Sequence, residues 1–511
     1  MGKTSGKAVV MLLLLTNYLH AQSSGTFSQQ QSDRIDSLLT GLAENHLFNG
    51  SVLIADQGKV VYKKSFGYAD IDNKILNTDT THFNLASVSK PFTSIAVLQW
   101  VQKGKLKLND PLVNYFPDFP YTTVTIRHLL NHTSGLPVLE RYTAQQVKEH
   151  PDEKISNTKA YADLVALKPA MVFQPGERWG YNNTNYILLA LLVEKLSGMP
   201  FAAYMKKYVF VPANMKNTYV RSVDAPNTPR YIIPAMYLKD YKNVDSLNHN
   251  VFYTHWHLGG TFGPGNVVST LQDLFQFDKA LHQGKLINKA MMEEAFTPVT
   301  LNNGKTFHMG ASTRTYGLGW NVYHSRKEPI YKYVFHDGHI VGLSTMLHRN
   351  IDKGQTIILY DNTDKSPIQL MVAINNILND LPPEKFRLTK SLVRIYGEAL
   401  VKNGPDYAAT KLNELKADTA NYYMDELEMN GLGYDLLFKA SFPNHNELSL
   451  EVFKINTLLY PKSANACDSY AEALMKNGKR EEAIRMYKQT LAMHPDNEGA
   501  KKALQQLTGS K

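Results

Sequence analysis

Residues 83–92 read FNLASVSKPF and form the most informative stretch of this 511-residue chain. Ser87 and Lys90 stand three positions apart, so in a helix their side chains share one face and the amine can reach the hydroxyl. A serine needs a neighbouring base of this kind before it can act as a nucleophile. The apolar residues before Ser87 and the proline at position 91 predict a helix start here. The alternative is an ordinary serine at the start of a helix.

The same spacing recurs at Ser156 and Lys159, where polar and charged residues surround it. Such surroundings indicate an exposed loop or a helix edge, and nothing near this second pair suggests chemistry. The motif is therefore weak by itself, and its context distinguishes Ser87 from Ser156.

The composition is that of a globular protein, with 43% hydrophobic and 20% charged residues. A chain of this length can build two or three domains and a large core. The net charge of +9 comes from basic residues that are interleaved with acidic ones and never form a long run. This distribution argues against a nucleic-acid partner.

Residues 1–21 are typical of a secretory signal peptide, because Lys3 and Lys7 precede a short apolar core at Ala8–Leu15. That core is far shorter than the about 20 residues of a spanning helix, and we expect no transmembrane segment. Cys467 is the single cysteine, so no intramolecular disulfide can form. We therefore expect a periplasmic or secreted protein. The alternative for residues 1–21 is a buried N-terminal helix of the folded protein.

The hydrophobic pattern predicts an α+β domain, with an antiparallel sheet flanked by helices and a largely helical subdomain. Strands at both ends of the segment enclose a helical stretch, so we expect both ends to complete one sheet. The predicted elements are an amphipathic helix around residues 35–42, a hairpin at 51–63 turned by residues 56–58, a mostly helical stretch from 91 to about 211, strands at 331–336, 342–348 and 355–360, and a helix at 368–378.

Beyond residues 381–383, which read LPP, nearly the whole sequence is helical in character. Pro461 and Pro495 stand 34 residues apart, which is the tetratricopeptide period. We predict tetratricopeptide-like repeats at residues 429–511, preceded at 381–428 by a helical linker or a degenerate repeat. Such repeats often present a concave face to a protein partner. The alternative is a plain helical bundle.

Two further triplets carry candidate functional groups. Tyr181 and Asn183 belong to the first triplet, which follows a Pro-Gly turn and precedes an apolar helix predicted at residues 186–196. His336 ends a predicted strand, and Gly338 follows where the backbone must approach another group closely. Similar triplets occur elsewhere in the chain, so their surroundings single them out. The alternatives are a helix cap for Asn183 and a structural role for His336.

Together these motifs resemble the serine β-lactamases and D-alanyl-D-alanine peptidases, in the branch that holds class C β-lactamases, some DD-carboxypeptidases and related esterases. That family carries Ser-x-x-Lys, Tyr-x-Asn and Lys/His-x-Gly in this order and at roughly these spacings. Residues 131–136, which read NHTSGL, and residues 265–274 resemble further segments of the family. The resemblance covers about Ile35 to Leu378, within a hydrolase domain expected at 22–380.

The resemblance implies acyl transfer through a serine ester. Ser87 would attack a carbonyl carbon, and Lys90 and Tyr181 would take its proton and pass one to the leaving group. The backbone N–H groups of Ser87 and His339 would form the oxyanion hole. No metal or other cofactor is implied.

The same resemblance implies a substrate site formed by Asn183, His336, Gly338 and His339, with Asn183 bonded to an amide carbonyl of the substrate. His336 stands where typical β-lactamases carry lysine, as in the DD-peptidases and esterases. Asp337 departs from the threonine or serine that the family often has, and it would repel a substrate carboxylate if it faced the site. This favours ester or amide substrates without a carboxylate, unless Asp337 turns away or pairs with His339.

We therefore expect an exported serine hydrolase that acts on a small-molecule or peptide substrate, with carboxypeptidase, esterase or β-lactamase activity. The alternative is a catalytically inactive protein of the same fold that binds or regulates a partner through its tail. His255 and His257 are the other notable histidines, and no acidic cluster at metal-ligand spacing accompanies them.

Overall fold

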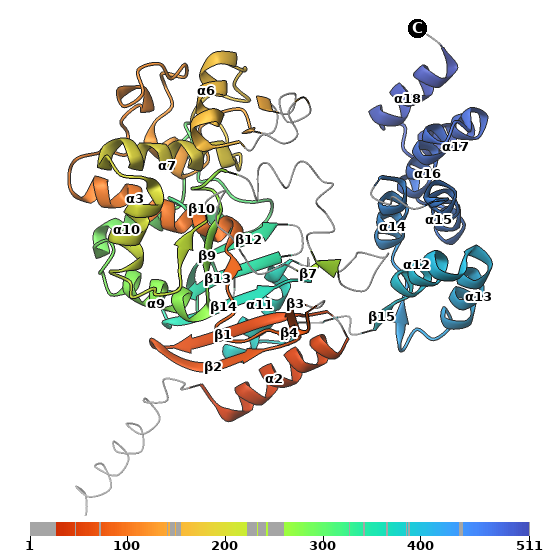
Figure 1. Cartoon of the computed structure of the whole chain (residues 1–511), viewed down its shortest axis with the longest axis horizontal. Helices are drawn as coiled ribbons and strands as arrows, with labels where there is room; N and C mark the ends of the chain where they lie inside the picture. Colours follow the sequence, from red (N-terminus) through yellow and green to blue (C-terminus); the bar gives the residue numbers. More distant parts are fainter. Residues whose placement is uncertain are drawn as a thin grey trace, which may run out of the picture.

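The computed structural model describes residues 27–45, 47–70, 73–139, 142–143, 149, 155–221, 232–233, 242–243, 260–326, 328–340, 343–363, 366–384, 386, 389–438 and 443–509. The predicted leader and the histidines at positions 255 and 257 lie outside these residues. The described part forms an α+β lobe and, after residue 389, a lobe made almost wholly of helices (Figure 1).

A seven-stranded sheet is the centre of the α+β lobe, in the order β10-β11-β12-β13-β14-β1-β2. All neighbouring strands are antiparallel, and β1 from the start of the domain pairs with β14 from its end. The predicted fold class, with a sheet completed from both ends, is therefore confirmed. The strands are β1 Gly50–Asp56, β2 Lys59–Ser65, β10 Thr315–Tyr316, β11 Asn321–His324, β12 Lys332–Ile340, β13 Leu343–Asn350 and β14 Gln355–Asp361.

The hairpin β1–β2 follows the prediction from its turn residues. Gln57 and Gly58 have φ angles of 47° and 74°, and Asp56 pairs with Lys59 across them. A two-residue turn with both residues in the left-handed region matches the right-handed twist of paired strands. The turn therefore fixes the register of the hairpin.

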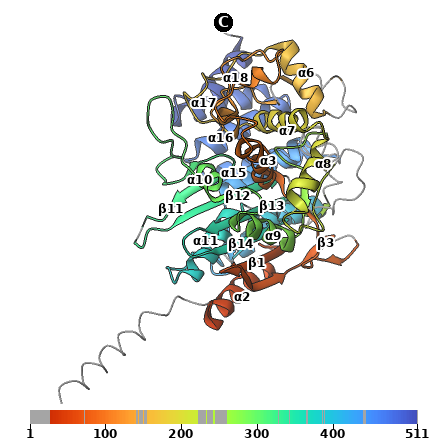
Figure 2. The same cartoon turned by 90° about the vertical axis from the view of Figure 1, so that its left-hand side faces the viewer.

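Helices cover both faces of the sheet (Figures 1 and 2). Helices α2 (Gln29–Glu44) and α11 (Pro367–Leu378) pack on one face against Val52, Ile54 and their neighbours. The alternate residues Leu53 and Ala55 belong to the core of the other face, where α3 (Ser89–Gln102) and α9 (Leu271–His282) lie. The period of two in β1 thus divides its side chains between two cores.

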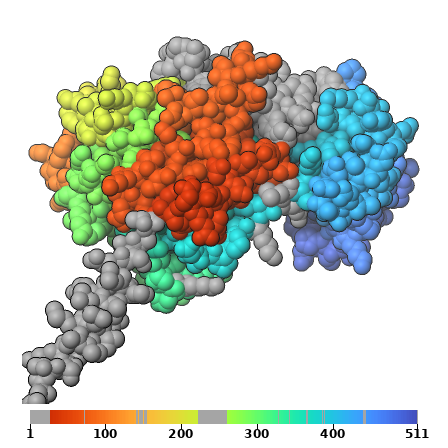
Figure 3. Space-filling model, turned by 90° about the horizontal axis from the view of Figure 1, so that it is seen from below, coloured from red at the N-terminus to blue at the C-terminus, as the bar shows by residue number. Residues whose placement is uncertain are grey.

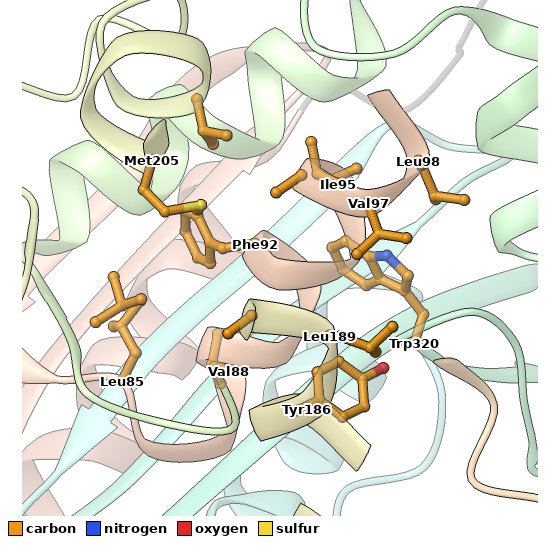
Figure 4. Packing of buried hydrophobic residues seen from close by; sticks show 14 of the residues in the cluster. Leu85, Val88, Phe92, Ile95, Val97, Leu98, Tyr186, Leu189, Met205 and Trp320 are labelled. Carbon is orange, nitrogen blue, oxygen red and sulfur yellow. The ribbon is translucent and has the colours of Figure 1, made fainter. Parts of the chain in front are cut away.

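Helix α3, which carries Lys90, is buried on all sides at residues 89–99. Figure 4 shows the residues of α3 from Phe92 to Leu98 packed among Tyr186, Leu189, Met205 and Trp320. Phe92 also stacks on Phe277 with ring centroids 3.9 Å apart. Each such side chain contributes about 1.5–3 kcal/mol when it is buried completely. The helix is consequently a rigid support for the residues at its start.

Shorter elements complete the lobe. Strand β5, just before Ser87, pairs with β9, which follows Pro264, so two distant segments lie side by side. The remaining elements are η1 Ala86–Val88, η2 Leu112–Asn114, α4 Ile126–Leu130, α6 Asn157–Leu167, α7 Asn183–Ser197, α8 Phe201–Met205, the π-helical turn η3 Lys206–Phe210, α10 Lys289–Ala295, β3 Tyr68–Asp70, β4 Ile75–Leu76, β5 Phe83–Asn84, β6 Tyr219–Val220, β7 Ile232–Ile233, β8 Lys242–Asn243 and β9 Val267–Ser269.

Two predicted boundaries need correction. Helix α7 begins at Asn183 and not at Tyr186, because the Asn182 side chain accepts a hydrogen bond from the Thr184 N–H and caps the helix earlier. Strand β12 continues past His336 to Ile340, since residues 338–340 stay paired with β13. The glycine at position 338 does not end the strand.

The C-terminal lobe contains antiparallel helix pairs with hydrophobic clusters of their own. Within the described residues, none of the buried hydrophobic clusters joins the two lobes, and Figure 3 shows the tail beside the α+β lobe. Its predicted helical class is confirmed, whereas its identity as a tetratricopeptide repeat and the boundaries at 381 and 429 stay predictions. Its elements are β15 Lys390–Ser391, α12 Leu392–Asn403, α13 Pro405–Leu415, β16 Tyr422–Tyr423, α14 Glu426–Phe438, α15 His445–Leu459, α16 Ala464–Lys476, α17 Arg480–Met493 and α18 Glu498–Thr508.

Across the described ranges, no single helix has the length and apolar character needed to cross a membrane. Only the bent pair 183–197 and 201–210 reaches that composition when its two parts are taken together. Helix α7 of this pair is largely buried in the core.

Candidate active site

Ser87 lies in the tight turn η1 that leads into α3. The residue before it, Ala86, has a φ angle of 46°, which is uncommon for a residue with a Cβ atom. The Ala86 N–H donates to Asn84 Oδ1 at 2.8 Å, and the Thr345 hydroxyl donates to the Leu85 carbonyl at 2.8 Å. These bonds hold the backbone in an unfavourable conformation, a feature often found at functional sites.

Lys90 is fully buried, and its amine lies beside Ser87. Nζ donates to Ser87 Oγ at 3.1 Å and to the Pro264 carbonyl at 2.9 Å. The contact between Ser87 and Lys90 that the spacing predicts is therefore present. The carbonyl of Pro264 was not expected from the sequence, since a backbone acceptor leaves no side-chain signal.

Tyr181 completes a group of three around the serine. Its ring lies 4.7 Å from Lys90 Nζ, measured to the ring centroid. The residue is 39% exposed, yet protein packs closely around its phenol, and this desolvation raises the pKa of Tyr181. A hydrogen bond with Ser87 lowers that pKa in part, and the charge of Asp337 raises it. The phenol is consequently protonated in the resting protein.

Asn183 is the first residue of α7, directly after the capping residue Asn182. The structure thus gives the helix-cap role to Asn182. Asn183 Oδ1 is buried, and none of the described residues offers it a hydrogen bond. Because an unpaired buried acceptor costs about 1–3 kcal/mol, this oxygen is suited to a donor supplied from outside the chain.

A cavity opens over these groups and contains both Ser87 and Asn183 in its wall. Both apolar and polar residues line the cavity. The further lining residues are Asn84, Ala86, Leu139, Ile187, Thr261, Pro264, Gly265, Asn266, His339 and Ile340.

His336 is buried and is not among the residues that line this cavity. Its Nδ1 is 2.7 Å from the Asp337 carbonyl and its Nε2 is 2.9 Å from the Tyr316 hydroxyl. A carbonyl only accepts, so Nδ1 carries the proton and Nε2 accepts from Tyr316. Burial is the main reason that the pKa of His336 falls to about 4. His336 is therefore neutral and supports the site from the interior.

Close packing requires glycine at position 338. A Cβ atom there would lie 2.3 Å from the Leu85 carbonyl oxygen and 2.4 Å from Thr345 Oγ1. Only glycine lets β12 approach the turn that carries Ser87 this closely. The next residue, His339, lines the cavity.

Asp337 pairs with Arg314, at 3.7 Å between Oδ1 and Nη2. Both side chains are 30% exposed, and Arg314 also donates from Nε to Asn321 Oδ1 at 2.9 Å. The expectations that Asp337 repels anions, turns away or pairs with His339 did not include this arginine. Arg314 partly compensates the negative charge next to the site.

The second Ser-x-x-Lys pair has a structural explanation. Ser156 Oγ accepts from the Lys159 N–H at 3.1 Å and caps α6, and Lys159 pairs with Asp163. The interpretation of this pair as a helix edge without chemistry agrees with that geometry.

Comparison with known proteins shows the family of this chain. The family model named Beta-lactamase matches residues 35–376, so the chain belongs to the beta-lactamase family. Penicillin-binding protein 4* of Bacillus subtilis strain 168 is 38% identical over 343 residues, covering 66% of this chain and 73% of that protein.

Solved structures show the same fold. The penicillin-binding protein of Bacillus halodurans has 25% identity and a TM-score of 0.55, covering 66% of this chain and 98% of that one. The D-amino acid amidase of Ochrobactrum anthropi SV3 complexed with D-phenylalanine has 21% identity and a TM-score of 0.55, covering 68% and 99%. The family match ends at residue 376, before the helical tail.

Proposed function

We propose that this chain is an exported serine hydrolase that forms a covalent acyl-serine intermediate with an amide, peptide or ester substrate. One observation carries the proposal. A fully buried amine lies 3.1 Å from the Ser87 hydroxyl, and Ser87 lines a cavity together with Asn183, whose buried Oδ1 has no partner among the described residues. This is the geometry of a nucleophile with an adjacent base.

In the proposed acylation step, Ser87 Oγ attacks the substrate carbonyl while Lys90 takes its proton. A lysine in water has a pKa of about 10.4, so a neutral amine near pH 7 requires about 4–5 kcal/mol from its surroundings. Complete burial of Lys90 works in that direction. Tyr181, with its raised pKa, keeps a proton that it can pass to the leaving group.

The charge that develops on the carbonyl oxygen would be bound by the N–H groups of Ser87 and His339, both in the cavity wall. A donor of this kind typically contributes about 10²–10³ in rate. Asn183 Oδ1 would accept from the amide N–H of the substrate and not bind its carbonyl, because this oxygen is the atom left without a partner among the described residues. The apolar residues Leu139 and Ile187 would contact its acyl side chain.

The Arg314–Asp337 pair bears on the substrate class. Compensation of Asp337 by Arg314 weakens the argument against substrates that carry a carboxylate. The relation to penicillin-binding proteins supports the inclusion of peptide and β-lactam substrates among those to be tested.

The test exposes residues 22–511 to a fluorescent penicillin, a fluorophosphonate and a chromogenic short-chain ester. We expect labelling or turnover in the wild type and in Ser156→Ala, and none in Ser87→Ala. Penicillin labelling would favour peptidase or lactamase chemistry, and ester turnover without it would favour an esterase. Silence of the folded wild type toward all three probes would support the inactive binding protein instead.

We also propose that the helical tail binds a protein partner. Leu427 and Leu458 are 70% and 71% exposed, on helices α14 and α15. The Asn456 amide donates to the Glu426 carbonyl at 3.3 Å, so these leucines lie toward the same end of the helix pair. These two exposed leucines are the feature of the tail that supports an interaction surface. Replacing both leucines by serine should leave Ser87 labelling unchanged.

A further inference from the structure

His132 is the most constrained residue near the site whose role the proposed chemistry leaves open. It follows α4 and is fully buried. Its φ angle of 63° lies in the left-handed region, which few residues with a side chain adopt. A histidine held in this conformation in the interior requires compensating interactions.

Those interactions attach His132 to the tyrosine segment. The carbonyl of His132 accepts from the Gly180 N–H at 2.9 Å, and its Nδ1 accepts from the Asn182 N–H at 3.2 Å. The Asn185 amide nitrogen also lies 3.3 Å from Nδ1, while its oxygen accepts from the Ser134 hydroxyl. Because a backbone N–H can only donate, Nδ1 is an acceptor and the proton of the neutral ring is on Nε2.

The Nε2–H group is buried, and among the described residues it has no hydrogen-bond partner. The ring lies among Tyr181, Tyr316 and Tyr186, with centroid distances of 4.4, 5.0 and 5.2 Å. The charged or titratable groups that face it from the packed elements are these tyrosines, Lys90 and His336. Burial, with smaller effects of Lys90 and His336, holds the pKa of His132 well below its usual value.

We propose that His132 is a positioning residue that acts on Ser87 through Lys90 and Tyr181. Nδ1 is occupied by the Asn182 N–H, and the His132 ring and Lys90 Nζ both contact the Tyr181 ring, at 4.4 and 4.7 Å from its centroid, so the unpaired Nε2–H belongs to the same buried group as the amine and the phenol. The positive end of this N–H dipole favours the deprotonated state of the lysine–tyrosine pair, without adding a net charge. The inference rests on the proposed acyl-serine chemistry, and it names His132 as a residue that adjusts the protonation of the base Lys90.

Two substitutions separate the functions of the two ring nitrogens. In His132→Asn, the amide oxygen replaces Nδ1 as the acceptor for Asn182, the left-handed φ is tolerated, and the Nε2–H is lost. In His132→Gln, the amide nitrogen replaces the Nε2–H donor and the Nδ1 acceptor is lost. The pH dependence of fluorophosphonate labelling is measured for both variants.

The acidic limb is the part of the pH profile in which the labelling rate rises as Lys90 loses its proton. In His132→Asn we expect this limb to move to higher pH by about one unit, so that labelling at a given pH on the limb is about tenfold slower. In His132→Gln the limb should stay near its wild-type position, while the rate falls at every pH because the tyrosine segment is less well held. Nitrogen NMR of labelled histidine should show the neutral Nε2–H form of His132 from pH 5 to 8.

His348 provides the matched control. It is also buried, with Nε2 2.8 Å from the Tyr323 hydroxyl and Nδ1 without a partner in the described part, but it lies among Tyr323, Tyr333 and Phe335. His348→Asn should reduce stability and leave the limb unmoved. An unmoved limb in His132→Asn, an equal movement in His348→Asn, or a charged His132 in the NMR spectrum would overturn the inference. A wild type that is not labelled at all would instead refute the proposed function, and the inference with it.

Discussion

A lysine in the interior is the residue-scale feature on which the account depends. Lys90 has no exposed surface, and its amine bonds to the Ser87 hydroxyl and the Pro264 carbonyl. Removing a charge from water costs several kcal/mol, and an apolar residue of the same shape does not bear that cost. A lysine at position 90 therefore lowers the stability of the fold, and the amine it supplies next to Ser87 is what the chemistry needs.

Lys90→Met should abolish function without unfolding the protein. We expect fluorophosphonate labelling to slow by about 10³-fold or more, because the base is lost, while the melting temperature stays equal or rises. Lys159→Met, in the second Ser-x-x-Lys pair, is the control and should label normally. A large loss of stability in Lys90→Met would show that the buried amine is mainly structural.

The ion pair beside the site leads to a prediction on substrate charge. In Asp337→Thr, Arg314 is left without its compensating carboxylate and faces the rim of the site. Substrates with a carboxylate should then bind about 5–10-fold more tightly, seen as a lower KM, and neutral esters should be unaffected. Arg314→Ala should have the opposite effect on the carboxylate substrates.

Asp36→Asn removes a comparable surface pair with Lys64 and is the control for a general charge effect. If Asp337→Thr gives no advantage to carboxylate substrates, the charge argument at this position is wrong.

At the scale of elements, strand β12 and the turn before α3 form the site by close approach. A Cβ atom at position 338 would clash with the Leu85 carbonyl, which is backbone, and with Thr345 Oγ1, a buried hydroxyl that is hydrogen-bonded to the same carbonyl. Gly338→Ala should therefore displace β12 from the Ser87 turn. We expect at least a tenfold loss of labelling and a loss of about 1–3 kcal/mol in the free energy of unfolding, measured in urea.

Gly499→Ala, near the start of α18, tests the specificity of that effect. A Cβ atom there meets only a side-chain oxygen at 3.3 Å, so the stability should change by less than about 1 kcal/mol. Normal labelling of Gly338→Ala would mean that the approach of β12 does not position the oxyanion hole.

The elements also show what the sequence can and cannot predict. Residues 56–58 specify their hairpin locally, because the turn geometry and strand alternation are both written in neighbouring residues. The length of β12 was underestimated because pairing with β13 overrides the weak strand propensity of Gly338. The Lys90 contact was predictable from helical spacing, whereas the Pro264 carbonyl and Arg314 come from distant segments that only the fold brings together.

At the scale of the whole molecule, the two lobes should respond differently to acid. His336 and His282 are buried with pKa values lowered to about 4, mainly by desolvation. Below a pH of about 6.5 the unfolded chain binds protons that the native chain does not, so the free energy of unfolding falls as the pH drops. The loss is complete near pH 4 and amounts to up to about 3 kcal/mol for each group.

The described tail holds only His445 and His494, and neither is buried. We therefore expect the α+β lobe to unfold at a higher pH than the helical lobe. All four tryptophans, at positions 100, 179, 256 and 320, precede the tail. Tryptophan fluorescence, excited selectively over tyrosine, therefore reports on the first lobe alone. The expected result is a loss of tryptophan fluorescence between pH 6.5 and 4, while the part of the helical circular dichroism that comes from the tail helices α12 to α18 is retained. Coincident transitions would show that the lobes unfold as one unit.

The central claim is that Ser87 is acylated. The most direct measurement is mass spectrometry of the intact protein after fluorophosphonate treatment, followed by peptide mapping of the adduct. We predict one adduct on the peptide that contains Ser87, present in Ser156→Ala and absent in Ser87→Ala. An adduct on another residue, or one that persists in Ser87→Ala, would contradict the account.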